Sequence, residues 1–214
     1  MKILGITLAE NLSMDNHIWA GQKSMVRGIN TKIALLRTLK PFLKTKDLGN
    51  IGSALINSTI AYGAPIWGMT TQKNIERLQS CQTRAARLVT GRGWQKGRIK
   101  EHRQTILTQL GWQNVQQLID SAILNMTKNS TLGQSSKGIN DMFKVKNPPN
   151  PRAGQGARIS HKGKITTKGK TFMLTAPNLY NKLPPELRNP NLSKEKFKGQ
   201  LKTHMKTQHH LPQH

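Results

Sequence analysis

Hydrophobic residues recur at helical spacing through most of the first 127 residues of the chain. Apolar residues three or four positions apart share one side of a helix, and this spacing predicts helices over 17–40, 47–61, 72–90, 98–110 and 114–127. Pro41 marks the end of the first helix, and Asp47 is the expected N-cap of the second. Asn114 and Gln117 have the spacing of a capping box. The pattern predicts a mainly α fold.

The remaining parts of the chain show other patterns. Residues 2–8 alternate as in a short β-strand, and a turn is expected at 11–15. Residues 128–171 are rich in Gly, Ser, Lys and Pro and lack periodicity. They predict a linker or mobile basic loop, with a short hairpin around 157–175. We therefore expect an irregular basic C-terminal half with a short β element at the N-terminus.

A last amphipathic helix is predicted near 193–206, after two prolines. Its Phe197 and Leu201 are spaced to dock on a core. Together these patterns divide the chain into five segments: a strand segment at 1–16, a helical domain at 17–127, a linker or loop at 128–171, a docking segment at 172–206 and a tail at 207–214.

The helix predicted at 72–90 separates charged from apolar residues. At about 100° per residue, four cations fall within roughly 40° of one line: Lys73, Arg77, Arg84 and Arg87. The opposite arc is filled by Ile75, Leu78, Cys81, Ala85, Leu88 and Val89. One face is thus able to pack while the other presents a row of positive charge. This arrangement suits a polyanionic partner.

Composition points to the same kind of partner. The chain has 34 Lys and Arg against 9 Asp and Glu, a formal net charge of +25 and a pI of about 10.9. Such a surface attracts phosphate backbones mainly through counterion release. A solvated basic surface without a specific partner is the alternative interpretation. Aromatic residues make up only 5% of the chain, so base stacking is not expected to dominate binding.

Candidate nucleic-acid contacts lie on four segments of the chain. They are Arg27, Lys73, Arg77, Arg84, Arg87, Arg92, Lys96, Arg98, Lys162, Lys164 and Lys168. The last three interleave with glycines and form either a phosphate-tracking arm or a soluble tether. Trp94 lies among basic neighbours and is a credible nucleic-acid contact, whereas Trp67 and Trp112 are expected to be packing anchors.

Several classes of site are not expected. Cys81 is the only cysteine, which excludes internal disulfides and Cys-based zinc modules, and its position on the apolar arc predicts a buried structural thiol. The histidines of the tail have nothing around them to fix a metal's geometry, so no metal site is expected. No apolar run approaches a membrane span, and no signal peptide is recognisable. We expect an intracellular protein with no small-molecule substrate.

Three parts of the sequence, which occur in a fixed order along the chain, resemble a known family. They are "ILGITLAENLSMDNHI" at 3–18, "INSTIAYGAPIWG" with "IERLQSCQTRAARLVTG" at 56–68 and 75–91, and "FMLTAPNLYNKLPPELRN" at 172–189. The chain resembles the region downstream of the polymerase core in reverse transcriptases of LINE-type (non-LTR) retrotransposons, most like the jockey group. Tyr180 stands where this family is expected to have Trp, and it is the third expected packing anchor.

The resemblance implies a thumb-like helical bundle that follows the last strand of the palm, at residues 1–16. In the family, adjacent aspartates before this strand hold two Mg²⁺ ions, but the chain contains no Asp-Asp pair. The resemblance therefore implies a fragment without catalysis or cofactor of its own. Its partners would be a template–primer duplex or the element's RNA, and the polymerase core. A free-standing RNA-binding or ribosome-associated protein and a functionless remnant of a decayed element are the alternatives.

Overall fold

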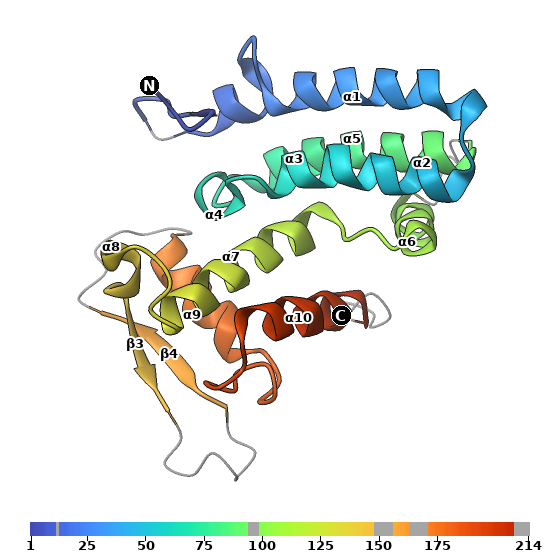
Figure 1. Cartoon of the computed structure of the whole chain (residues 1–214). Coiled ribbons are helices and arrows are strands. Elements are labelled where there is room, and N and C mark those ends of the chain that lie inside the picture. Colours follow the sequence, from blue (N-terminus) through green and yellow to red (C-terminus); the bar gives the residue numbers. More distant parts are fainter. Residues whose placement is uncertain (12, 94–98, 148–155, 163–170, 208–214) are drawn as a thin grey trace. The chain divides into compact units, whose positions relative to one another are not determined.

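The computed structural model describes residues 1–11, 13–93, 99–147, 156–162 and 171–207 (Figure 1). It is mainly helical, with two short two-stranded sheets, which confirms the predicted fold class. The chain forms two compact units. The first extends to Ile119 and the second begins at Asp120, inside the long helix α7 (Val115–Thr131).

Most elements of the first unit are helical (Figure 1). They are β1 (Lys2–Ile3), β2 (Ile6–Thr7), η1 (Asn16–Ala20), α1 (Met25–Leu39), η2 (Lys40–Phe42), α2 (Thr45–Gly52), η3 (Ser53–Asn57), α3 (Ser58–Ala61), α4 (Ala64–Trp67), α5 (Gln72–Thr90) and α6 (Ile99–Leu110), followed by the start of α7. Helix α5 has the predicted bounds. It ends at Gly91, which takes a left-handed conformation with φ of 70°.

The N-terminal segment is a hairpin instead of the single strand that was predicted. β1 and β2 pair antiparallel, with Ile3 opposite Ile6. Leu4 and Gly5 both have positive φ, of 47° and 82°, as the central residues of a tight hairpin turn require. The Tyr62 hydroxyl donates a hydrogen bond to the Leu4 carbonyl at 2.9 Å and supports this turn. The alternation of 2–8 concealed the turn because Leu is an unusual residue at positive φ.

The helix predicted at 17–40 is divided into two. η1 is a π-type turn that is closed by a hydrogen bond from the Gly21 amide to the Asn16 carbonyl. A Cβ at Gly21 would lie 2.4 Å from that carbonyl oxygen, so only glycine fits. The backbone is extended at Gly21, and α1 begins at Met25. The turn places Trp19 and Ala20 on the surface instead of along the helix.

The helix predicted at 47–61 also differs in detail. It begins at Thr45, so Asp47 lies inside the first turn and is not the N-cap. The wider turn of η3 then rotates the buried face, because a π turn contains more residues than an α turn. Ile56 is fully buried as a result, whereas Leu55, which regular helical spacing from Leu48 would place on the buried side, is only half-buried. Leu48 and Ile60 are buried.

Two of the expected aromatic anchors lie in the core of the first unit. Trp67 is fully buried, and its indole N–H donates to the Tyr62 carbonyl at 2.8 Å. Gly63 precedes α4 in a left-handed conformation with φ of 63°, and a Cβ there would lie 2.5 Å from Ile6 Cδ1. Trp112 is 3% exposed and packs on Gly52. Burial of these rings contributes strongly to the core because each removes a large apolar area from water.

The buried face of α5 is wider than the predicted apolar arc. Gln79 and Gln82 are buried and hydrogen-bonded to each other at 2.8 Å. Gln82 also donates to Asn57 and to the Gln113 carbonyl, and Gln79 accepts from the Val115 amide. Side-chain amides are stably buried only when their own donors and acceptors have hydrogen-bond partners. The network therefore ties α5 to η3 and to the start of α7.

The start of α7 has the capping box that was predicted. The Gln117 amide donates to Asn114 Oδ1 at 2.9 Å, and the Asn114 amide donates to Gln117 Oε1 at 3.0 Å. These reciprocal bonds satisfy two backbone donors at the helix end. The helix then runs to Thr131, four residues past the predicted end.

The second unit contains regular structure where an irregular linker was expected. Its elements are the remainder of α7, α8 (Lys137–Asn140), β3 (Phe143–Lys146), β4 (Arg158–His161), α9 (Phe172–Asn181) and α10 (Lys194–Thr207). β3 and β4 pair antiparallel, so the partner of 158–161 lies upstream of the hairpin position that was predicted. Side chains of Phe143 and Ile159 are buried, but each strand is too short to give a clear alternating pattern.

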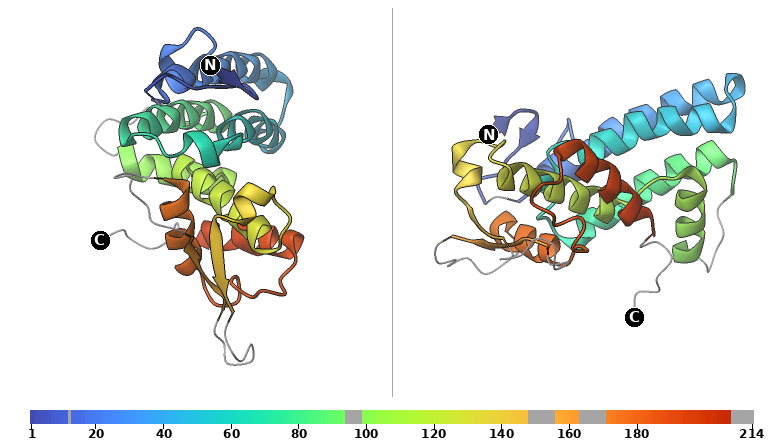
Figure 2. Two further views of the ribbon diagram at one scale, coloured as in Figure 1. Left: turned by 90° about the vertical axis from the view of Figure 1, so that its left-hand side faces the viewer. Right: turned by 60° about the horizontal axis from the view of Figure 1, so that its bottom comes forward.

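The core of the second unit gathers residues from α7, β4, α9 and α10. It contains Leu124, Ile159, Tyr180, Leu183, Leu187, Phe197, Leu201 and Met205. α9 lies beside β4 in both views of Figure 2, and the Asn181 amide pairs with the Ile159 backbone through two hydrogen bonds. Phe197 and Leu201 are buried, as predicted. Tyr180, the third expected anchor, is 1% exposed.

Candidate nucleic-acid interface

Helices α1 and α5 pack side by side and run in the same direction. The contacts of α5 with α1 and with the preceding η1 segment follow both sequences in order. Asn74 bonds to Asp15 before η1, Arg77 lies over Trp19 of η1, and Arg84 bonds to Asn30 of α1. Lys40 Nζ lies 3.9 Å from a Cβ built at Gly91. We call the line of residues from Trp19 and Arg77 to Lys40 and Arg92 the α1–α5 seam.

The seam begins at a stacked pair. The Arg77 guanidinium carbon lies 3.9 Å from the centroid of the Trp19 ring, which is the geometry of a cation–π contact. Arg77 also donates to Asn74 Oδ1 at 3.0 Å, and Asn74 donates to Asp15 at 2.6 Å. That hydrogen bond is the main cause that lowers the pKa of Asp15, with smaller contributions from Trp19, Ser13 and Arg77. Arg77 is therefore a fixed cation.

The middle of the seam holds a second fixed arginine. Arg84 Nη2 donates to Asn30 Oδ1 on α1 and lies 3.8 Å from Cys81 Sγ. Asn30 is a neutral acceptor, so it orients the guanidinium without cancelling its charge. Cys81 is buried, as predicted, and burial raises the pKa of its thiol. A raised pKa keeps the thiol protonated and unreactive at neutral pH.

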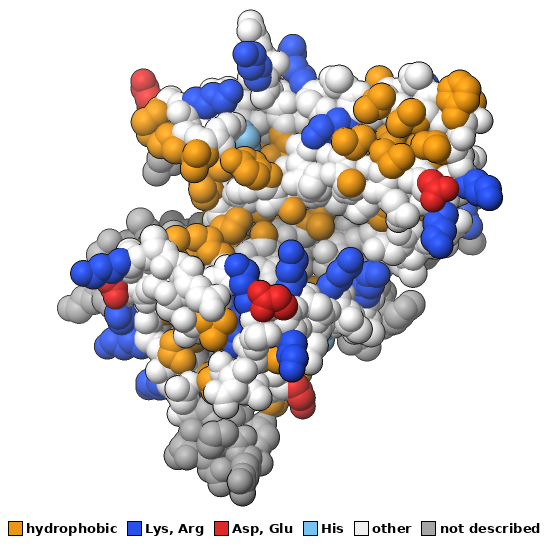
Figure 3. All heavy atoms as spheres, viewed as in Figure 1, with side chains coloured by type: hydrophobic (Ala, Val, Ile, Leu, Met, Phe, Trp, Pro, Cys, Tyr) orange, Lys and Arg blue, Asp and Glu red, His pale blue; other side chains and the backbone are white. Residues whose placement is uncertain are grey.

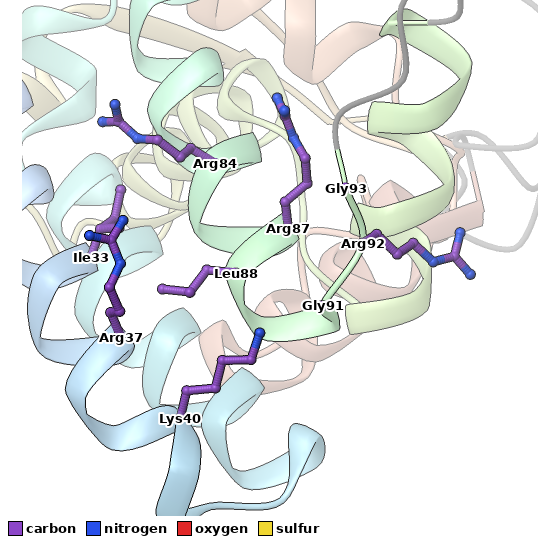
Figure 4. Close-up of a pocket in the computed structure, with 9 residues that line it drawn as sticks. All are labelled: Ile33, Arg37, Lys40, Arg84, Arg87, Leu88, Gly91, Arg92 and Gly93. Carbon is purple, nitrogen blue, oxygen red and sulfur yellow. The ribbon is translucent and has the colours of Figure 1, made fainter.

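The seam ends in a basic pocket of about 330 Å³ (Figure 4). Its cations come from the ends of α1 and α5, and Ile33 and Leu88 are its apolar side chains. The cations are Arg37, Lys40, Arg84, Arg87 and Arg92. In Figure 4 Lys40 reaches toward Gly91, whereas the Arg92 guanidinium points away from Lys40. We call this group the five-cation pocket.

The electrostatics of the pocket are one-sided. Among the residues that the structure describes, no carboxylate lines it. Arg87 Nε is buried and has no hydrogen-bond partner there. Within the described ranges, ion pairs form elsewhere, between Arg103 and Glu76 at 3.2 Å and between Lys162 and Asp141 at 3.7 Å.

The structure brings some of the predicted residues together and separates others. Arg77, Arg84, Arg87 and Arg92 lie along the seam. Arg27 and Lys73 are exposed on α1 and α5 but do not line the pocket. Lys162 belongs to the second unit and pairs with Asp141. The remaining predicted residues lie outside the described residues: Trp94, Lys96, Arg98, Lys164 and Lys168.

Four seam residues were not predicted as contacts: Trp19, Asn30, Arg37 and Lys40. Arg37 lies on the polar side of the first predicted helix, together with Arg27. The polar side of this helix indicated that Arg37 is available for binding, but only the packing of α1 against α5 brings Arg37 and Arg87 into one pocket. Trp19 was hidden because a continuous helix was expected through η1.

Within the described ranges, no group of three or more His, Cys, Asp and Glu side chains is placed to hold a metal ion. Of the helices described, none is long and apolar enough to cross a membrane.

Comparisons with known proteins show similarity over part of the chain. No protein-family model matches the chain, and no solved structure matches it. Among curated proteins, the chain is 28% identical over 93 residues to a protein named "Probable RNA-directed DNA polymerase from transposon X-element", from Drosophila melanogaster. The match covers 44% of this chain but only 10% of that protein. The chain is therefore similar to a part of a transposon RNA-directed DNA polymerase.

Proposed function

We propose that the chain is a nucleic-acid-binding part of a LINE-type retrotransposon reverse transcriptase, with a thumb-like role. In this proposal the α1–α5 seam holds the phosphate backbone of a template–primer or of the element's RNA. Catalysis is supplied by a separate polymerase core, because adjacent aspartates for two metal ions are absent from the sequence. The protein would act in the nucleus or the cytoplasm.

The observation that carries the proposal is the five-cation pocket. Arginine guanidinium groups match the geometry of phosphate oxygens and keep their charge at all physiological pH values. Here arginines from two helices line one pocket, and Arg84 is oriented by the neutral amide of Asn30. The partial similarity to a transposon polymerase supports the choice of nucleic acid as the anion.

A charge-matched pair of variants tests the proposal. One variant changes Arg37, Arg84 and Arg87 to Gln, and the control changes Lys198, Lys202 and Lys206 to Gln. Both lose three positive charges, all six residues lie on helices, and Gln preserves helix propensity. The control residues are exposed on α10, where basic side chains are visible in Figure 3.

Binding to labelled oligonucleotides would be measured over a range of salt concentrations. Loss of three phosphate contacts should reduce the slope of log K against log salt by about 2 to 3 units. At about 0.1 M salt this corresponds to roughly 100-fold weaker binding. The α10 control should change the slope by much less. Equal losses in both variants would mean that binding depends on overall charge, and unchanged binding in the arginine variant would exclude the seam as the interface.

A further inference from the structure

Trp19 differs from the other tryptophans that the structure describes. Trp67 and Trp112 are 0% and 3% exposed, whereas Trp19 is 40% exposed. One face of its ring is covered by Arg77 at 3.9 Å. A large ring with one face against a cation and much of its surface in water is available for a further contact.

The orientation of Trp19 is fixed before any ligand arrives. The Asp15 carboxylate accepts a hydrogen bond from Asn74 at 2.6 Å, and the nearby Trp19 side chain contributes to the lowered pKa of Asp15. Asn74 is itself 1% exposed and donates a second bond to Thr70 at 2.8 Å. Because Arg77 bonds to the same Asn74, one buried amide positions both Arg77, which covers the Trp19 ring, and the carboxylate beside that ring. Little side-chain freedom is left to lose on binding, which favours affinity.

Trp19 also lies in line with the phosphate-binding groups. Arg77, Arg84 and Gly91 are spaced seven residues apart on α5, so they follow one side of the helix within about 40°. The fourteen-residue separation between Arg77 and Gly91 corresponds to a rise of about 21 Å. At roughly 3.4 Å per nucleotide in a stacked strand, several nucleotides fit between the Trp19 ring and the five-cation pocket.

We propose that Trp19, backed by Arg77, is a base-stacking platform, and that the α1–α5 seam takes a single-stranded segment of nucleic acid. Phosphates occupy the five-cation pocket while a base stacks on the open face of Trp19. Aromatic stacking accepts any base, since every base has a π face. Bases inside a duplex are already stacked on their neighbours and are not free to use the ring. The inference rests on the proposed function and adds to it a preference for single-stranded over double-stranded nucleic acid.

The sequence expectation differs at this point, because the low aromatic content suggested that stacking would not dominate. One exposed ring among many cations is compatible with a charge-dominated affinity. Stacking on Trp19 then contributes the preference for single strands, whereas the arginines contribute most of the salt dependence.

Tryptophan fluorescence offers a direct test. In a Trp94→Phe background the remaining tryptophans are Trp67 and Trp112, both buried, and Trp19. Titration with a single-stranded homopolymer such as oligo(dT) should quench the emission, because a stacked base contacts the Trp19 ring. A blunt duplex of equal length should quench it much less. Binding of oligo(dT) without quenching would overturn the platform while leaving the proposed function intact.

Variants separate stacking from charge. Trp19→Leu should weaken binding of oligo(dT) by about 5- to 150-fold with an unchanged salt slope, and Trp19→Phe should retain most of the affinity. The control Tyr62→Leu removes another exposed aromatic ring, which contacts the N-terminal hairpin instead of Arg77, and should have no effect. Equal loss on single strands and duplex, or no loss, would contradict the platform. If the arginine triple variant also binds normally, the proposed function itself fails.

Discussion

Each unit of the chain holds a pair of cations with fixed partners, and the two pairs have opposite surroundings. In the first unit, Arg77 and Arg84 lie at the surface or close to it, and an aromatic ring and side-chain amides hold them in place. In the second unit, Lys128 and Arg188 are buried, at 1% and 9% exposure, and donate to backbone carbonyls. The first arrangement leaves positive charge at the surface, and the second uses charge to hold loops.

Lys128 illustrates the structural use. Its ammonium group donates to the Asn189 carbonyl at 2.8 Å and lies 5.8 Å from the centre of the Phe197 ring. Burial lowers the pKa of Lys128, which is the sign expected for a cation that is removed from water without a carboxylate partner. Net charge alone therefore overstates the binding surface. Location and the type of hydrogen-bond acceptor decide which cations are available to a polyanion.

The largest expected effect is on the stability of the second unit. Arg188 donates to the carbonyls of Leu183, Gly156 and Ala157 at 2.9, 3.1 and 3.2 Å. Arg188→Ala leaves these buried acceptors unsatisfied and should cost about 3 kcal/mol or more. All four tryptophans precede Asp120. Chemical denaturation should therefore show a weakened transition by far-UV circular dichroism, with little change by tryptophan fluorescence.

The control for this variant is Lys198→Ala, at an exposed position on α10. It should change stability by no more than about 0.5 kcal/mol. If Arg188→Ala shifts the tryptophan transition as much as the circular dichroism transition, the two units do not unfold separately. The two units would then differ in how their cations are placed but would unfold together.

A smaller effect is expected at alkaline pH. Burial raises the pKa of Tyr180 from 10 to about 12, so the folded second unit keeps a proton that the unfolded chain releases. The stabilising contribution is complete below about pH 10 and is lost as pH rises toward 12, on the order of 2–3 kcal/mol. Tyr180→Phe should remove this dependence.

Measurement of urea midpoints by circular dichroism at about pH 8 and about pH 11 checks the effect. Lys128 changes stability with pH in the opposite direction. Because its pKa is lowered in the folded protein, folding becomes more favourable as pH rises toward the pKa of lysine in the unfolded chain. The difference between wild type and Tyr180→Phe isolates the tyrosine. Parallel pH curves for the two proteins would show that Tyr180 is not responsible.

The smallest effect tests whether a fixed arginine binds better than a mobile one. Asn30→Ala removes the amide that orients Arg84 but keeps every charge. Ordering Arg84 only on binding should cost about 0.5–1.5 kcal/mol, and affinity should fall by roughly 2- to 10-fold. Thr31→Ala, at the neighbouring exposed position on α1, is the control. Competition binding at fixed salt distinguishes them, and equal affinities would mean that Asn30 does not preorganise the seam.

The sequence by itself determined the features that depend on near neighbours. Spacing predicted both bounds of α5 and the residues of its apolar arc, and the Asn114–Gln117 capping box followed from a three-residue motif. Phe197 and Leu201 were placed on the buried side of α10 for the same reason. In each case the signal lies in residues within one or two helical turns of each other, so periodicity is sufficient to predict which side of the helix is buried or how the helix begins.

The tertiary structure alone decided the features that depend on distant partners. The turn at η1 exposes Trp19, and its cationic partner Arg77 comes from a different helix. Arg37 and Arg87 share a pocket because α1 packs beside α5. Lys128 and Arg188 are buried because carbonyls far along the chain accept hydrogen bonds from their side chains. A buried or stacked cation is stable only when such a partner is in place, and a local pattern of residues carries no information about that partner.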